Sequence, residues 1–424
     1  MCDKLTAVNN HLISQIKSVI SENIDLNRDI NDDEIRDMVI KAVFDFFRND
    51  YIGIAEKKEL VDAVFNSMRR FDILQPVIED KTITEIMVNG PDNIFIEREG
   101  RISSLNVKFE SCEKLEDVIQ AIVSKTNRAV NESSPIVDAR LTDGSRVNVV
   151  LKPIALNGPI MTIRKFPENP MTIEQLVEIG SLTGEVAEFL YCLVKARYNI
   201  FICGGTGSGK TTFLNALSGF IPRDERIITI EDSAELQINS VDNIVKMETR
   251  NANTEGKGQI TIRDLIRTSL RMRPERIIVG EVRGAEAIDM LQAMNTGHDG
   301  SLSTGHANSA QDMMSRLETM ILSAAPLPLD AIRRQIATAI DIVIHLSRLR
   351  DKSRRVLEIS EIDGCRDGNI RLNPLFLFNE DGETPEGMVI GCLKRTKNCM
   401  LHTGKFIMAN VSYNLGGEKN KGSK

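Results

Sequence analysis

The feature that most constrains the fold of this chain is a glycine-rich turn between a predicted strand and a predicted helix. The turn fills every position of the phosphate-binding pattern G-x-x-x-x-G-K-[ST] with Gly204, Gly205, Thr206, Gly207, Ser208, Gly209, Lys210 and Thr211. An apolar run, residues 199–203, precedes the turn, and Phe213, Leu214 and Leu217 follow at helical spacing. Glycines let consecutive backbone N–H groups point at phosphate oxygens, and a helix start adds positive potential. The sequence therefore predicts a strand, a phosphate-binding loop and a helix over residues 199–219.

This loop predicts a site for a nucleotide and a divalent cation. Lys210 is expected to reach the β- and γ-phosphates, and the Thr211 hydroxyl is expected to ligate Mg²⁺. Thr212 follows at the predicted helix start and completes the residues expected to contact the nucleotide. An ordinary flexible turn is the alternative, and the matching strand and helix on either side argue against it.

Composition argues against several other classes of function. The aromatic content of 4% and the absence of Trp argue against a platform for stacking nucleic-acid bases, and the net charge of −7 does not suggest general DNA or RNA binding. Seven scattered cysteines without a C-x-x-C pair indicate free thiols in a reducing compartment and no zinc site. No apolar run approaches the ~18 residues of a membrane helix, and the first residues lack a signal-peptide pattern. We therefore expect a cytoplasmic protein without a transmembrane segment, which can still work at a membrane through partners.

The region before the loop divides into two parts. Residues 1–80 carry apolar side chains at helical spacing as far as Leu74, and Pro76 would stop this pattern. The spacing predicts a small helical bundle or a docking module. Residues 81–168 change to strand-like patterns and predict a separate, smaller α/β module. Within it, two apolar runs flank the turn 142–145, a hairpin signal. Three arginines lie on or beside its strands, namely Arg140, Arg146 and Arg164. Solvated strand residues and an anion-facing cluster are both open interpretations of these arginines.

From residue 169 to about 350, helical and strand patterns alternate around the phosphate-binding loop. This alternation predicts a mostly parallel sheet with helices on both faces, which binds ligands at the carboxyl ends of its strands. Acidic residues directly follow two predicted strands: Glu231, Asp232 and Glu235 after the first, and Glu281 after the second. A carboxylate at that edge can hold Mg²⁺ through water or orient an attacking water. Acidic residues beside turns are mostly solvated, so only their position next to an intact phosphate-binding loop supports a catalytic role for these four.

Two of the five histidines, His298 and His306, lie in a Gly-, Ser- and Thr-rich stretch. A zinc site would need further Cys or His partners at suitable spacing, and none is near in the sequence. An isolated polar histidine is more often structural. The alternative is that this pair senses the γ-phosphate or transmits its presence across the site.

Four motifs now stand in order along the chain: the phosphate-binding loop, residues 229–235, residues 271–283 and residues 297–306. They resemble the Walker A, Asp box, Walker B and His box of the secretion ATPase superfamily, which powers type II and type IV secretion, type IV pili and archaeal flagella. The residues of segments 298–308 and 138–148 most resemble the CpaF/TadA branch, the tight-adherence (Flp) pilus assembly ATPases. The resemblance covers about residues 80 to 350.

The resemblance implies an α/β fold in which a RecA-like P-loop domain with a mostly parallel sheet follows a smaller, PAS-like α/β domain and a helical N-terminal segment. It implies ATP and Mg²⁺ as ligands. Lys210 and Thr211 would bind phosphates and Mg²⁺, and Glu281 would be the Walker B acid. Glu235 would polarise the attacking water. The resemblance further implies that Glu231 and Asp232 lie near the metal and that His298 and His306 are the His-box residues.

Enzymes of this family work as hexameric rings with nucleotide between the two domains. The resemblance therefore implies a homo-hexamer that acts on an inner-membrane platform protein, without direct contact to nucleic acid. Arg140, Arg146 and Arg164 resemble basic positions that close on the phosphates within or between subunits, which would couple hydrolysis to domain movement.

The end of the chain matches the family less well. Residues 351–413 predict short strands in a small C-terminal region, and the Gly-, Lys- and Ser-rich residues 414–424 predict a disordered tail. Three other functions remain open. The nearest is a type IV secretion ATPase that moves effector proteins or DNA, and the second is a nucleotide-gated scaffold with little turnover. A small-molecule kinase comes third, because the sequence shows no pocket for a second substrate.

Overall fold

The computed structural model describes residues 10–23, 30–48, 52–98, 100–126, 128–141, 143–166, 170–252 and 257–413. They form two compact units, unit 1 (Met1–Glu168) and unit 2 (Asn169–Lys424). The predicted tail, residues 414–424, lies outside the described residues. No helix within the described ranges is both long and apolar enough to span a lipid bilayer.

Unit 1 begins with three helices that share one apolar core: α1 (Asn10–Glu22), α2 (Asp32–Phe46) and α3 (Ile54–Arg69). The spacing of apolar residues gives each helix one buried stripe, which includes Ile16, Val39 and Val64. Asn31 begins α2, because its side chain accepts a hydrogen bond from the Glu34 backbone N–H at 2.9 Å. These faces pack on one another, as the helical-bundle interpretation predicted. Two short helical turns, η2 (Asp72–Leu74) and α4 (Gln75–Glu79), lead into the sheet.

A six-stranded sheet follows in unit 1, with the order β3-β2-β1-β6-β5-β4 and antiparallel pairing throughout. Its strands are β1 (Ile83–Asn89), β2 (Ile94–Arg98), β3 (Arg101–Leu105), β4 (Ile136–Arg140), β5 (Arg146–Val150) and β6 (Ile160–Arg164). The predicted hairpin is the β4–β5 pair. Helix α5 (Cys112–Ser124) packs its buried side, including Ile119, on one face of the sheet.

Unit 2 is built on a nine-stranded sheet with the order β15-β14-β13-β12-β7-β11-β10-β8-β9. Its strands are β7 (Ile200–Gly204), β8 (Arg226–Glu231), β9 (Asn243–Glu248), β10 (Arg276–Val282), β11 (Leu302–His306), β12 (Ile342–Arg348), β13 (Arg354–Arg366), β14 (Asn369–Glu383) and β15 (Val389–Arg395). The six strands from β12 to β9 pair in parallel, and the three from β13 to β15 are antiparallel. The mostly parallel α/β fold expected from the sequence is confirmed.

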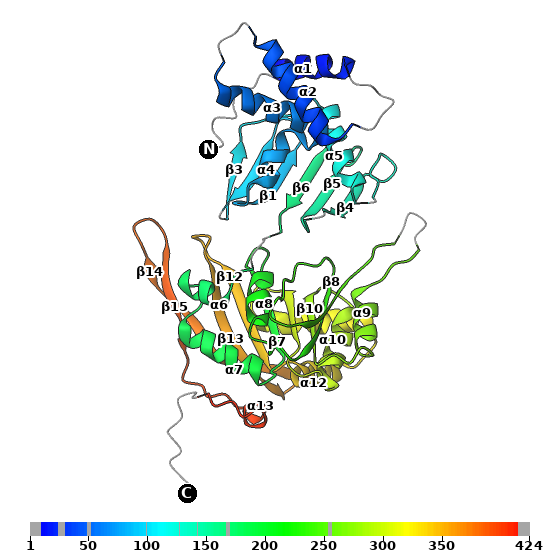
Figure 1. The fold of residues 1–424 in the computed structure, drawn as a ribbon. Helices are drawn as coiled ribbons and strands as arrows, with labels where there is room; N and C mark the ends of the chain where they lie inside the picture. The colour runs from blue at the N-terminus through cyan, green and yellow to red at the C-terminus, as the bar shows by residue number, and fades with distance from the viewer. Residues whose placement is uncertain are drawn as a thin grey trace. The chain divides into compact units, whose positions relative to one another are not determined.

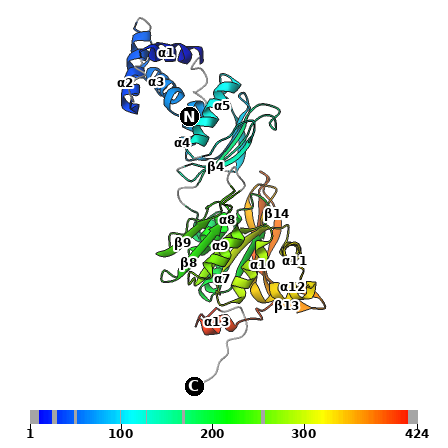
Figure 2. The same cartoon turned by 90° about the vertical axis from the view of Figure 1, so that its right-hand side faces the viewer.

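Helices cover both faces of this sheet, each over its own apolar core (Figure 2). The first face carries α6 (Ile173–Glu178), α7 (Gly184–Lys195) and α8 (Lys210–Ser218). The second face carries α9 (Ile262–Ser269), α10 (Glu286–Asn295), α11 (Ala310–Ala324) and α12 (Leu329–Ala339). The buried parallel strands read as continuous apolar runs because both of their faces are covered.

The C-terminal strands do not stand apart from the central sheet. β13 pairs with β12, and buried side chains such as Ile359 and Phe376 extend the core of the first face. The chain then passes to α13 (Gly404–Met408), drawn in red in Figures 1 and 2. The domain boundary expected from the sequence at residue 350 therefore falls between two paired strands of one sheet.

Candidate active site

The phosphate-binding loop leaves the carboxyl end of β7 and enters α8 at Lys210. Gly204 has no room for a side chain, because a Cβ there would lie 2.3 Å from the Leu346 carbonyl oxygen and 2.6 Å from Ser208 Oγ. Gly207 and Gly209 adopt φ values of +70° and +92°, which disfavour residues with a Cβ. Nothing lies within 4 Å of a Cβ built on Gly205 or Gly207, so the backbone is open to a ligand there. The loop geometry fits a phosphate cradle.

Lys210 is buried beneath this loop. Its Nζ donates to the carbonyl oxygens of Gly204 at 3.1 Å and Gly205 at 2.9 Å, and it lies 3.3 Å from His306 Nδ1. Burial lowers the pKa of Lys210, and the nearby Glu281 carboxylate opposes that shift. The ammonium is therefore held at the loop, where the β- and γ-phosphates of a nucleotide are expected.

Glu281 lies at the end of β10 between two basic side chains. Its Oε2 accepts a hydrogen bond from Arg283 Nη2 at 2.9 Å, and its Oε1 lies 2.9 Å from His306 Nε2. The second contact is an ion-pair distance rather than a well-aligned hydrogen bond, because Oε1 has no hydrogen-bond partner of good geometry among the described residues. Arg283 also reaches towards Asp232, with 3.6 Å between Nη1 and Oδ2.

His306 connects Lys210 to Glu281. Burial lowers the pKa of His306, and the Lys210 charge lowers it further. The Nδ1 of His306 lies 3.3 Å from the Lys210 Nζ, and its Nε2 lies 2.9 Å from the Glu281 Oε1. Lys210, His306 and Glu281 thus form one continuous polar chain from the phosphate-binding loop to the acid.

The three acids after β8 differ in their surroundings. Glu231 is buried, and its Oε1 accepts from the backbone N–H groups of Glu235 at 2.9 Å and Leu236 at 3.1 Å. This carboxylate therefore holds the backbone of its own loop, and the metal role expected for Glu231 stays a prediction. Asp232 is exposed and lies near Arg283, while Glu235 is half-buried and adds to the negative charge around Arg283.

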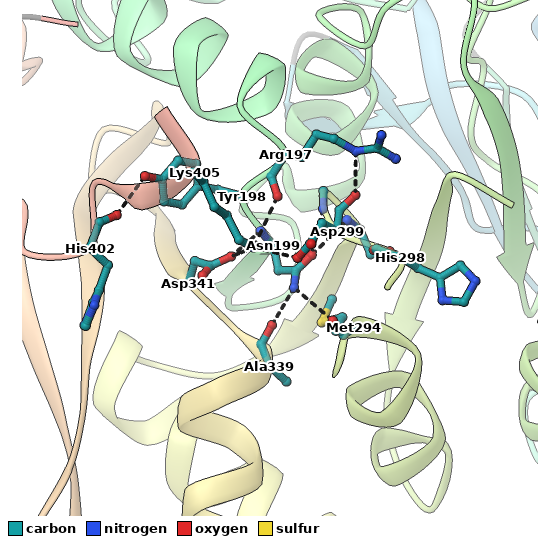
Figure 3. A network of polar contacts seen from close by, with 12 residues as sticks. Arg197, Tyr198, Asn199, Met294, His298, Asp299, Ala339, Asp341, His402 and Lys405 are labelled. Carbon is teal, nitrogen blue, oxygen red and sulfur yellow. Dashed lines mark hydrogen bonds and ion pairs between the residues drawn. The ribbon is translucent and has the colours of Figure 1, made fainter. Parts of the chain in front are cut away.

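The structure separates the two histidines that the sequence paired. His306 pairs with Gly204 at the carboxyl end of β7, whereas Leu302, four residues earlier, pairs with Ile200 at its beginning. His298 precedes β11, so roughly 13 Å of strand lies between the two histidines. The Nδ1 of His298 lies 3.2 Å from the Ala293 carbonyl oxygen, and the His298 ring points away from a polar network around Asn199 (Figure 3). Within this chain, His298 therefore lies away from the phosphate-binding loop that His306 adjoins, and a phosphate-sensing role for either histidine stays a prediction.

That network lies at the amino ends of the strands. Asn199 accepts from the Gly300 backbone N–H at 2.8 Å and donates to the Ala339 carbonyl oxygen at 2.8 Å (Figure 3). Lys405, from α13, donates to Asp299 at 2.8 Å and Asp341 at 2.7 Å. These contacts fasten the C-terminal segment to the edge of the sheet opposite the phosphate-binding loop.

In unit 1, the three predicted arginines form one row across neighbouring strands. Arg140 on β4 pairs with Arg146 on β5, and Arg146 pairs with Arg164 on β6. Directly paired residues present their side chains on the same face of a sheet, so three positive charges lie side by side. Arg140 also donates to the Gly144 carbonyl oxygen at 3.2 Å, and an anion-facing role for this row stays a prediction.

A pocket of about 810 Å³ opens in unit 2 beside the phosphate-binding loop. Its lining residues are Gly205, Thr206, Arg283, His306, Ala307, Asn308, Asp312, Ser315, Arg316 and Thr319. Thr211, half-buried at the start of α8, and Glu281 offer the oxygen donors that Mg²⁺ prefers, so these residues fit a magnesium-bound nucleotide. Arg283 and Arg316 line this pocket but were not among the site residues predicted from the sequence. Arg283 follows Glu281 by two residues and could have been found there, whereas Arg316 lies on a helix beyond all four motifs.

Comparison with known proteins gives consistent matches. The family model described as "Type II/IV secretion system protein" matches residues 68–383. A putative conjugal transfer protein of Mycobacterium tuberculosis is 35% identical over 294 residues, which cover 68% of this chain and 83% of that protein. The type IV secretion system protein VirB11 of Brucella suis is 33% identical over 300 residues, with 64% and 83% of the two chains covered. The crystal structure of the pilus retraction motor PilT with bound ADP has a TM-score of 0.50 at 18% identity and covers 80% of this chain and 87% of PilT, which is a likeness of fold.

Proposed function

Because the chain belongs to the type II/IV secretion system protein family and is an ATPase, we propose that it is the motor of a pilus assembly or protein secretion system. In this proposal, copies of the chain form a hexameric ring. ATP-driven closure of the two units does work on a platform protein of the inner membrane, to which the ring is bound from the cytoplasmic side. A closer relationship to the tight-adherence pilus branch is part of the proposal and is supported by segments 138–148 and 298–308.

One observation carries the proposal: the polar chain that links Lys210, His306 and Glu281 at the phosphate-binding loop. The loop amides and Lys210 bind the phosphates, and Thr211 with Glu281 would hold Mg²⁺, which neutralises charge on the phosphates when bound. His306 reports on both groups, because it contacts the ammonium with one ring nitrogen and the acid with the other.

We assign the attacking water to Glu235, with Glu281 as its alternative. Glu235 is held by the Glu231 carboxylate, which fixes the Glu235 backbone at 2.9 Å. From a backbone held in this way, the half-buried Glu235 carboxylate would orient a water for in-line attack on the γ-phosphorus. Substitution of each acid by its amide separates them: Glu235→Gln that lowers kcat with unchanged nucleotide affinity supports this assignment. A Glu235→Gln variant with normal kcat would transfer the role to Glu281.

The arginine row supports shared sites in a ring. Arg140, Arg146 and Arg164 offer a positive surface that would meet the phosphates only on closure. A charge that arrives with closure stabilises the transition state more than the ground state, and this couples hydrolysis to movement.

A type IV secretion or conjugal transfer motor is the second candidate, because the relatives reported above are named for conjugal transfer and type IV secretion. Such a system moves effector proteins or DNA. The net charge of −7 disfavours direct DNA contact by this chain. DNA binding that weakens steeply with added salt would favour the DNA-transfer candidate, and absence of binding would favour protein substrates or pilins.

The direct experiment is ATP hydrolysis by the full chain and by Lys210→Ala. We expect phosphate release by the wild type and at least an approximately hundredfold loss in the variant, because the lysine stabilises charge in the transition state. Unchanged thermal unfolding of Lys210→Ala is the control for folding. A variant that hydrolyses ATP normally would refute the proposal, and nucleotide binding with negligible turnover in the wild type would favour a scaffold.

A further inference from the structure

One wall of the pocket is formed by α11 and not by any of the four motifs. Four residues of this helix line the pocket at positions i, i+3, i+4 and i+7, namely Asp312, Ser315, Arg316 and Thr319. This spacing places their side chains on one face of the helix. All four are polar and exposed, so the pocket that begins at Gly205 and Thr206 continues along a polar surface.

The orientation of this face is fixed by the rest of α11. The opposite side of the helix carries Met313, Met314 and Leu317, which are fully buried in the core of the second face. Ser309 Oγ accepts the Asp312 backbone N–H at 2.9 Å and sets the start of the helix. A rotation of α11 would expose its apolar stripe, so the polar face stays turned to the pocket.

The charges around the pocket favour an anionic ligand at this wall. The lining residues include two arginines, Arg283 and Arg316, and a single acid, Asp312. Arg283 is already engaged with Glu281 and Asp232. The guanidinium of Arg316 forms no hydrogen bond or ion pair with any residue that the structure describes, and its positive charge is among the causes that lower the pKa of His306.

We propose that Arg316 is a further catalytic residue, which binds the terminal phosphate of ATP. Lys210 lies where it is expected to contact the β- and γ-phosphates, and the pocket extends from the loop past His306 to α11. A planar guanidinium is the side chain best suited to paired hydrogen bonds with a phosphate group. During hydrolysis, water attacks the γ-phosphorus while its bond to the bridging oxygen of ADP breaks. Arg316 stabilises the negative charge on the γ-phosphoryl oxygens without taking part in a covalent step.

The inference rests on the motor function proposed above and adds a test for the terminal phosphate. The full chain and its variants are titrated with a fluorescent ADP analogue, which is displaced by ADP in one series and by ATPγS in another. For Arg316→Gln, we expect the affinity for ATPγS and the kcat each to fall by about tenfold or more, while the affinity for ADP changes by less than about twofold. Arg316→Lys is expected to recover part of the loss, since it keeps the charge but not the paired hydrogen bonds.

Arg334→Gln is the matched control, because Arg334 is an exposed arginine on α12 that does not line the pocket. It should leave both affinities and kcat unchanged. Two results would overturn the inference: ATPγS affinity and kcat of Arg316→Gln within about twofold of the wild type, or equal weakening of ADP and ATPγS. If the wild type hydrolyses no ATP, the motor proposal fails, while the comparison of the two nucleotides still decides the role of Arg316.

Discussion

Arg276 gives the sharpest test of how the central sheet is held together. It is the first residue of β10, its side chain is fully buried, and it forms an ion pair with Glu225 in which Nη2 lies 2.9 Å from Oε1. Its Nη1 also donates to the carbonyl oxygens of Val194 at 2.8 Å and Gly300 at 3.3 Å. One side chain therefore joins four segments at the amino edge of unit 2.

The substitution Arg276→Met leaves the Glu225 carboxylate buried without its cation and removes one hydrogen bond from each of two carbonyl oxygens, of which that of Val194 still accepts from the Arg197 backbone N–H at 3.1 Å. Removing one partner of a buried ion pair costs about 3–5 kcal/mol. For a unit of this size, that loss corresponds to a decrease in Tm of roughly 6 to 20 °C. Urea unfolding of the full chain, followed by circular dichroism, measures the free energy of unfolding directly.

Two further variants show whether the reasoning is right. The double variant Arg276→Met with Glu225→Met should regain the part of the stability that the unpaired carboxylate costs, because an apolar pair of similar volume can replace a buried ion pair at little cost, whereas the hydrogen bond to the Gly300 carbonyl oxygen stays lost. Arg334→Met, on the surface of the same unit, should change the unfolding free energy by less than about 0.5 kcal/mol. A loss below about 1 kcal/mol for Arg276→Met alone would refute the account of this ion pair.

Three other predictions follow from the same structure. Since the pKa of His306 is lowered in the folded chain, the unfolded chain binds a proton there more readily, and stability falls as the pH drops below about 6.5. The wild type should therefore lose more unfolding free energy between pH 7.5 and 5.5 than His306→Gln. An equal loss in the two proteins would contradict this prediction. Gly204→Ala should cost about 1–3 kcal/mol in urea unfolding because its Cβ meets the Leu346 carbonyl oxygen, whereas Gly205→Ala, which meets open space, should cost little. Lys405→Met should lower stability by about 1–3 kcal/mol in thermal unfolding, because the Asp341 carboxylate loses its cation. Burial already raises the pKa of Asp341, so this carboxylate depends on Lys405 for its charge. A Tm for Lys405→Met equal to that of the exposed control Lys397→Met would contradict this prediction.

Local patterns were sufficient to predict the elements around the phosphate-binding loop. The apolar run 199–203 matches β7, and the loop motif ends where α8 begins at Lys210. The hairpin of β4 and β5 is also predictable from the sequence, because its turn residues are close together in the chain. In each case the signal lies within a few residues, so no knowledge of distant contacts was needed.

The rest depended on register and on distant packing. His298 and His306 belong to one motif, and only the parallel pairing of β11 with β7 shows that they lie at opposite ends of a strand. Glu231 has the residue type of a metal ligand, yet its carboxylate caps the backbone of its own loop. Arg316 joins the pocket because the buried side of α11 fixes the helix, which no local motif records.

In the proposed hexamer, ATP turnover at the phosphate-binding loop requires a ring with shared sites. Steady-state ATP hydrolysis should be measured against protein concentration for the wild type, Lys210→Ala, Arg146→Ala and mixtures of the two variants. A ring with shared sites predicts that wild-type specific activity rises with concentration, that each variant is inactive alone, and that mixing changes activity non-linearly. Slow turnover that is independent of concentration, with a linear response to mixing, would contradict it.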